Sequence, residues 1–169
     1  YTEPEEILER PCLQELSSAL CIKDLDGSRR RMLAVIAAAL MNNIRVILKL
    51  PVNGDYEQAS LRWLQEIFTL IPARDRCEIA FSTAKKEADV QYFRDFNLVL
   101  SDQGLRYEAK MNELVLSSDI ELSEEDMDQL IGSINTRSDK EQIMGDARLF
   151  YSGKWAEECP IASNEVGTE

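Results

Sequence analysis

Three polar residues, Ser82, Thr83 and Asp102, lie at the C-terminal ends of predicted strands, where ligands of parallel sheets usually bind. Ser82 and Thr83 close a strand predicted over 77–83, and Asp102 comes shortly after one predicted over 96–100. Serine and threonine hydroxyls can hydrogen-bond a phosphate group, and a carboxylate can bind a metal ion. The same residue types also cap helices and form turns, which is the role that the sequence favours. The three residues define an alternative function, the binding of a small molecule or nucleotide at the C-terminal ends of the strands.

The residues on which most catalytic and nucleotide-binding sites depend are missing. The chain has no histidine, which excludes Ser-His-Asp and Cys-His nucleophiles and removes the commonest metal ligand. The four cysteines form no CxxC pair, and the glycines are too widely spaced to form GxGxxG or GxxxxGK[ST]. The sequence therefore predicts no catalytic residue, no metal site and no cofactor, and it favours a protein without enzymatic activity.

Charge is strongly negative and unevenly distributed. The 19 Lys and Arg residues against 31 Asp and Glu residues give a net charge of −12, which disfavours binding to nucleic acids and to anionic membranes. The segment 29–50 contains basic residues and no acid: Arg29, Arg30, Arg31, Arg45 and Lys49. The segment 111–135 contains acids and no base: Glu113, Asp119, Glu121, Glu124, Glu125, Asp126 and Asp128. We expect these segments to form two surfaces that face each other.

Arg29, Arg30 and Arg31 stand at the start of a predicted helix, where positive charge opposes the helix dipole. Two explanations are open. The arginines pair with acids of the same chain, such as the 119–128 block, or they contact a bound anion or an acidic partner. The first explanation is favoured, and the second makes the five basic residues of 29–50 a candidate contact surface.

Hydrophobic patterning predicts an α/β domain with a small, mainly parallel sheet of three strands. The apolar run 32–41 predicts a nearly fully buried helix, with Ser28 as its cap. Alternation predicts the strands, and connecting segments of more than about ten residues favour parallel pairing through helices. The predicted strands cover 44–50, 77–83 and 96–100, and the predicted helices between them cover 55–71 and 84–94. Cys77 opens the second strand, where we expect a buried thiol.

Further elements follow the third strand. After a turn over 101–104, residues 105–109 are predicted to return antiparallel to that strand as a hairpin. Leu114 to Leu116 predicts a short additional strand. Two amphipathic helices are then predicted to begin at the capping residues Ser123 and Ser138.

Each predicted strand has one strongly apolar face and one small or polar face, whereas a parallel sheet covered on both sides is usually apolar throughout. We therefore expect helices to cover one face. The other face is then thinly covered, solvated or contacted by something outside this chain. Edge strands or a polar helix would produce the same pattern.

The length of 169 residues fits a single domain over 1–155. We expect a helical lead-in over 1–28, an α/β core over 29–118, C-terminal helices over 119–155 and a flexible acidic tail over 156–169. The sequence shows no signal peptide, so we expect a cytoplasmic protein with reduced cysteines.

Residues 31–83 carry short motifs that point to a family. The motif Leu/Ile-Pro-x-x-x-Arg is present from Ile71-Pro72 to Arg76, and Phe81-Ser82-Thr83 ends the following strand. In these motifs, and in the buried helix before IRVILKLP, the segment resembles the middle region of the bacterial GTPase-associated proteins of the first type. Those are multidomain proteins found alongside small GTPase-like partners. The resemblance implies a non-catalytic α/β module within a larger bacterial protein or complex, and it covers roughly a third of the chain.

The sequence as a whole predicts a non-catalytic protein-interaction or scaffold module. Its expected partner is another protein, including a GTPase-type protein, or another domain of the parent chain.

Overall fold

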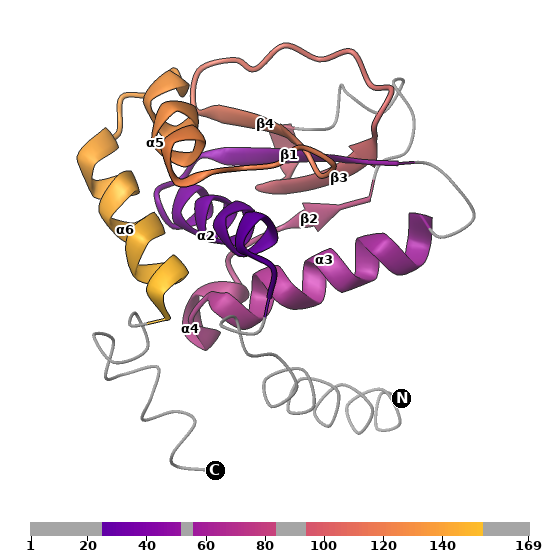
Figure 1. The fold of residues 1–169 in the computed structure, drawn as a ribbon. Helices are drawn as coiled ribbons and strands as arrows, with labels where there is room; N and C mark the ends of the chain where they lie inside the picture. The colour runs from indigo at the N-terminus through magenta and orange to yellow at the C-terminus, as the bar shows by residue number, and fades with distance from the viewer. Residues whose placement is uncertain (1–24, 52–55, 84–93, 154–169) are drawn as a thin grey trace.

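The computed structural model describes residues 25–51, 56–83 and 94–153 (Figure 1). Most of the predicted helical lead-in, the helix predicted over 84–94 except its last residue, and the predicted tail lie outside these ranges. The described elements in chain order are α2 (Gly27–Met41), β1 (Arg45–Leu50), α3 (Tyr56–Leu70), α4 (Ala73–Arg76), β2 (Phe81–Ser82), β3 (Leu98–Asp102), β4 (Glu113–Ser117), α5 (Glu124–Ser133) and α6 (Lys140–Ser152).

The sheet has four strands in the order β2-β3-β1-β4, and every pair of neighbours is parallel. Val46 stands opposite Leu98 on one side and Leu114 on the other, which places β1 in the centre. The α/β class and the parallel sheet are confirmed. The predicted number of three strands was too low, because the short strand expected at Leu114–Leu116 joins the same sheet as β4.

The predicted antiparallel hairpin over 105–109 was wrong. β3 is paired with β1 along its whole length on one side, and its first two residues pair with β2 on the other, which leaves a returning segment little open edge. The chain after β3 instead runs without regular structure across the sheet to the start of β4. Leu105 and Tyr107 of this segment pack on Ile47 and Val99.

The second predicted strand is shorter than expected. Only Phe81 and Ser82 form β2, whereas residues 73–76 form the short helix α4. Hydrogen bonds from Glu78 N to Asp75 O (3.2 Å) and from Ile79 N to Arg76 O (3.2 Å) continue this turn past Cys77. Cys77 is therefore exposed and does not open a buried strand.

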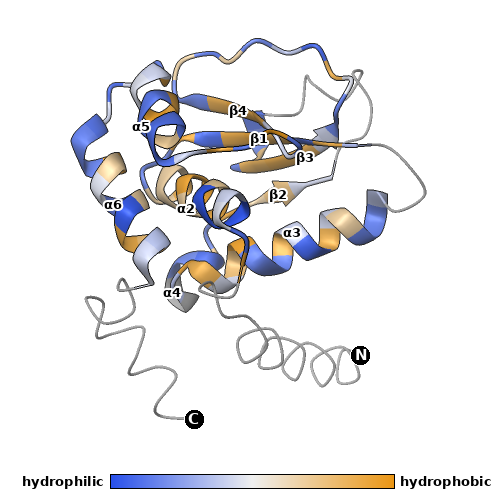
Figure 2. Ribbon diagram, in the orientation of Figure 1, coloured by the Kyte–Doolittle hydropathy of each residue, from blue (hydrophilic) through white to orange (hydrophobic). Residues whose placement is uncertain are grey.

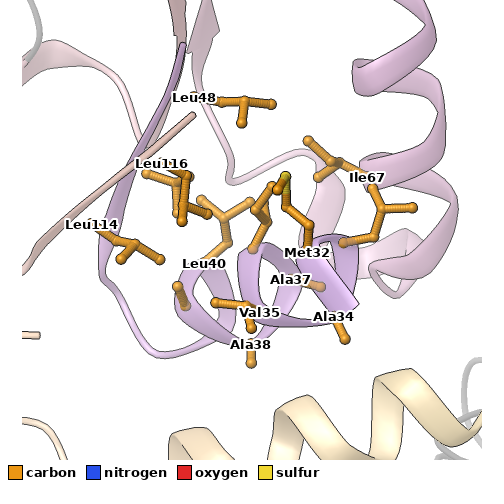
Figure 3. Packing of buried hydrophobic residues seen from close by; sticks show 14 of the residues in the cluster. Met32, Ala34, Val35, Ala37, Ala38, Leu40, Leu48, Ile67, Leu114 and Leu116 are labelled. Atoms are coloured by element: carbon orange, nitrogen blue, oxygen red, sulfur yellow. The ribbon is translucent and has the colours of Figure 1, made fainter. Parts of the chain in front are cut away.

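Helix α2 occupies the centre of the core. Nine consecutive residues, from Met32 to Leu40, are buried, which confirms the prediction of a nearly fully buried helix. Leu48, Leu114 and Leu116 of the sheet contribute to the core above α2, and Ile67 of α3 packs beside Met32 (Figure 3). Ala34 and Ala38 point away from the sheet, and their small side chains allow α6 to lie close against α2 (Figures 1 and 3).

The helix starts use caps that differ in part from the predicted ones. Asp26 caps α2 by accepting a hydrogen bond from Ser28 N (3.2 Å), while the Ser28 hydroxyl accepts one from Leu122 N (2.8 Å). Ser28 thus links α2 to the segment before α5 rather than capping its own helix. The predicted Ser123–Asp126 capping box of α5 is confirmed. Helix α6 begins one residue later than expected, with Asp139 as its cap.

The two faces of the sheet are covered differently. Val46, Leu48 and Leu50 of β1 belong to the large core with α2, α3, α5 and α6, whereas Ile47 belongs to a small cluster on the opposite face. In Figure 2, α3 alternates between hydrophobic and hydrophilic residues along its length, as a helix with one buried face does. Among the described residues, all long helices therefore pack on one face.

The topology explains why residues 103–112 cover the other face. The connections from β1 to β2 and from β3 to β4 cross the sheet in opposite directions. Parallel crossovers are almost always right-handed, so connections that run in opposite directions must pass over opposite faces. Helix α3 covers the face of the sheet that contains Leu48, and residues 103–112 cover the face that contains Ile47.

Candidate functional site

Arg29 joins α2 to α3. Its guanidinium forms an ion pair with Glu66 at 2.6 Å and stacks on the ring of Trp63, 3.7 Å from the ring centroid. Glu66 is buried, with only 6% of its surface exposed, and its other oxygen accepts a hydrogen bond from Arg62 (3.2 Å). Arg29 therefore neutralises a buried carboxylate, which is a structural role.

Arg30 and Arg31 join α2 to the C-terminal part of the domain. Arg30 Nε donates to the backbone oxygen of Tyr151 in α6 (2.6 Å), and its guanidinium lies over the Tyr151 ring. Arg31 Nη1 donates to the backbone oxygen of Leu122 (3.0 Å). In the described ranges no ion pair joins Arg29, Arg30 or Arg31 to a carboxylate of the 119–128 block. The predicted intramolecular pairing is thus present for Arg29 alone, and with an acid of α3.

Arg45 belongs to a polar network at the start of β1 and β4. It forms an ion pair with Glu113 (2.9 Å) and donates to the backbone oxygens of Arg94 and Phe96. The Tyr107 hydroxyl donates to the same carboxylate at 2.8 Å. Burial, together with the hydrogen bond to Glu113 and its negative charge, raises the pKa of Tyr107 to about 12. This network holds the segment 103–112 against the sheet.

Ser82 and Asp102 do not come together. Ser82 stands opposite Val99, three residues before Asp102, which is about 10 Å along a strand. Since side chains alternate between the faces of a strand, Ser82 lies on the face of Val99 and Asp102 on the opposite face. Asp102 Oδ1 accepts a hydrogen bond from Gly104 N (2.8 Å), which is a turn contact, and Thr83 is exposed.

A different polar group lies at the C-terminal edge of the sheet. Lys49 stands opposite Ser101 of β3 and Ser117 of β4, so the three side chains form one row on the face of Ile47. Ser101 is only 1% exposed, and its hydroxyl has no hydrogen-bond partner among the described residues. Ser101 and Ser117 could not be predicted from the sequence, because only the strand register shows that they flank Lys49.

Asp119 connects the loops that follow β3 and β4. Its carboxylate accepts hydrogen bonds from Ser117 Oγ (2.6 Å) and from Gln103 Nε2. These two bonds, with a smaller contribution from the charge of Lys49, lower the pKa of Asp119 below its ordinary value. Asp119 is therefore ionised at neutral pH.

Five exposed acids extend from this position into the first turn of α5. We call them the acidic surface: Asp119, Glu121, Glu124, Glu125 and Asp126. The acids in the first turn of α5 interact favourably with the positive end of the helix dipole. In the part of the chain that the structure describes, no ion pair neutralises any of these five residues, and the nearby Asp128 pairs with Arg148 (3.3 Å). The acidic surface is therefore a strongly negative region that begins after the end of β4 and continues into the first turn of α5.

Two other features that bear on function are metal-binding groups and membrane-spanning helices. The described residues contain no group of three or more His, Cys, Asp or Glu side chains that could hold a metal ion. None of the described helices is long and apolar enough to cross a membrane.

Comparison of the chain with protein-family models, with curated proteins and with solved structures finds no match. The resemblance of residues 31–83 to the GTPase-associated proteins stays a prediction.

The role of Arg29 can be tested with a matched pair of arginines. Arg29→Ala leaves the buried Glu66 without its main cation, so we expect the free energy of unfolding to fall by about 3 kcal/mol. Arg62→Ala removes the exposed partner of the same carboxylate (68% exposed), so we expect a loss below about 0.5 kcal/mol. Urea denaturation measures both changes. Equal effects of the two substitutions would contradict the structural role of Arg29.

Proposed function

We propose that this domain is a non-catalytic protein-interaction or scaffold module that works with another protein or with another domain of a larger protein. The observation that carries the proposal is the acidic surface. Five exposed carboxylates follow one another there within residues 119–126, and in the described part of the chain none of them forms an ion pair.

The use of the basic residues supports this assignment. Arg29, Arg30, Arg31 and Arg45 are all engaged in contacts that hold the fold together. The candidate contact surface on these arginines is therefore less suited to a partner than the acidic surface. Uncompensated like charges repel one another, and a cationic protein surface relieves that repulsion and is attracted at long range.

The class of partner follows from charge and from the resemblance. A net charge of −12 disfavours nucleic acids as partners. The resemblance of residues 31–83 to the bacterial GTPase-associated proteins supports a cytoplasmic bacterial system in which the partner is a GTPase-type protein or a domain of the parent chain.

A second candidate function, the binding of a small anionic ligand, is supported by the unpartnered hydroxyl of Ser101. The connections after β1 and β3 pass over opposite faces, and ligands of parallel sheets bind where neighbouring strands diverge in this way. Lys49 beside Ser101 supplies a positive charge at that edge. A phosphate-containing ligand is the class that these two groups fit.

The interaction proposal is tested by charge reversal. The domain is immobilised and exposed to lysate of the organism that encodes it, with the triple variant Glu121→Lys, Glu124→Lys, Glu125→Lys beside the wild type. We expect a protein that the wild type retains to bind the variant at least about tenfold more weakly, because each reversed charge repels a cationic partner.

A control variant with the same change in net charge carries Glu78→Lys, Glu108→Lys and Glu141→Lys, three exposed acids outside the acidic surface. The control should retain the partner. Equal loss of the partner from both variants, or no retained protein, would contradict the proposal.

The ligand proposal is tested by a thermal-shift panel of ATP, GTP, cyclic nucleotides and inorganic phosphate. A ligand at 100 times its Kd stabilises the folded state by about 2.7 kcal/mol, which raises the Tm by roughly 5–10 °C. The interaction proposal predicts no shift. A shift that Lys49→Met abolishes would support the small-ligand function instead.

A further inference from the structure

We propose that the outer edge of β4 binds an extended, basic segment of the partner protein, which adds to the sheet as a fifth strand. This inference rests on the proposed function and names the surface and the kind of partner. It combines the unpaired backbone of β4 with the charge and the exposed apolar residues around it.

The backbone of β4 is paired on one side only. Arg45 N donates to Asn112 O (2.8 Å) and Ser118 N donates to Lys49 O (2.9 Å), so the even-numbered residues direct their backbone groups towards β1. Residues 113, 115 and 117 therefore direct theirs away from the sheet. Within the described ranges, the N–H and C=O of Val115 and the N–H of Ser117 have no hydrogen-bond partner. They form a template for another strand.

The two edges of the sheet differ in their capacity to accept a strand. The other edge strand, β2, has two residues, and very short strands discourage pairing. β4 has five residues, and it contains neither the proline nor the lysine that proteins commonly use to block an edge. An extended peptide can therefore form a ladder along β4, as in other cases of strand addition.

Exposed apolar residues flank the edge at both ends. Met111, just before β4, is 46% exposed, and Ile120, just after it, is 41% exposed. Val115 between them is half-buried on the face of the sheet that residues 103–112 partly cover. A strand that pairs with β4 would bury parts of these side chains, which adds hydrophobic stabilisation to the backbone hydrogen bonds.

The acidic surface selects a basic segment. Asp119 comes two residues after the end of β4, and Glu121 comes two residues later. Helix α5, whose first turn carries the remaining acids, lies beside the start of β4 in Figure 1. Asn135, which follows the last turn of α5, accepts a hydrogen bond from Asn112 N (2.7 Å). Lysine or arginine side chains of an added strand would meet these carboxylates, whereas an acidic strand would be repelled.

The test uses a synthetic probe, the peptide Lys-Thr-Val-Lys-Val-Thr-Lys, and the 15N-labelled wild-type chain. We expect binding in the micromolar to low millimolar range, with protection of the Val115 and Ser117 amides from hydrogen exchange. Two control peptides have either Glu for each Lys or N-methyl groups on alternate residues, and both should bind at least tenfold more weakly. The N-methylated peptide keeps the charge but loses hydrogen bonds to the edge.

Val115→Pro is the matched change in the domain. Proline removes an outward N–H that the ladder with β1 does not use, so the fold should persist while the probe binds at least tenfold more weakly. No binding of the basic peptide, or equal binding of the N-methylated peptide by the wild type, would overturn the inference. The N-methylated peptide keeps the test valid if Val115→Pro fails to fold.

The results that would overturn this inference differ from the results that would overturn the proposed function. A partner that the charge-reversal variant loses and Val115→Pro retains would overturn edge pairing and leave the interaction module standing. If the peptide pairs with β4 but the domain retains no protein from lysate, the proposed function is overturned, whereas the edge of β4 is still a binding site.

Discussion

The burial of Met32 to Leu40 in α2 is the constraint on which the rest of the structure depends. Its residues from Met32 to Leu40 expose at most 8% of their surface, so this part of the helix is buried on all sides. An ordinary surface helix packs one stripe against a sheet. Here the sheet covers one side of α2, and α3, α5 and α6 must cover the others. The C-terminal helices are therefore a necessary part of the core.

This arrangement determines where the charges of the chain are used. The arginines at the start of α2 contact α3, α6 and the segment before α5. These contacts hold the three segments against the central helix. The arginines are not available to neutralise the acids that follow β4. The same helices crowd one face of the sheet, while on the other face Ile47 packs with Val99 and Leu105 in a small cluster. The acidic surface and the outer edge of β4 are left uncovered by the described part of the chain.

The sequence predicted those elements whose patterns are local. The apolar run of α2, the alternation in β1 and the Ser123–Asp126 capping box all lie within a few residues, and each is present. The direction of the segment after Asp102 could not be predicted in this way, because it depends on which edges of β3 are already occupied. The turn that continues from α4 to Ile79 could not be predicted, because Cys77 and Ile79 alternate with Glu78 and Ala80 as residues of a strand do.

The candidate site shows the same limit. The charges of 29–50 and 111–135 are visible in the sequence, but the actual partners of Arg29 and Arg45, Glu66 and Glu113, come from separate elements. The row of Ser101, Lys49 and Ser117 exists only through the register of three strands. The open edge of β4 likewise depends on the strand order, which no local pattern encodes.

Residue-resolved hydrogen exchange of the unbound domain tests the account most directly, because it measures both the central helix and the edge strand. We predict the slowest exchange for the amides of Ala34 to Leu40 in α2. Within β4, Leu114 and Leu116 should exchange at least ~100-fold more slowly than Val115 and Ser117, whose N–H groups point away from β1. Equal protection of all four β4 amides would show that this edge is already paired, and it would contradict the account.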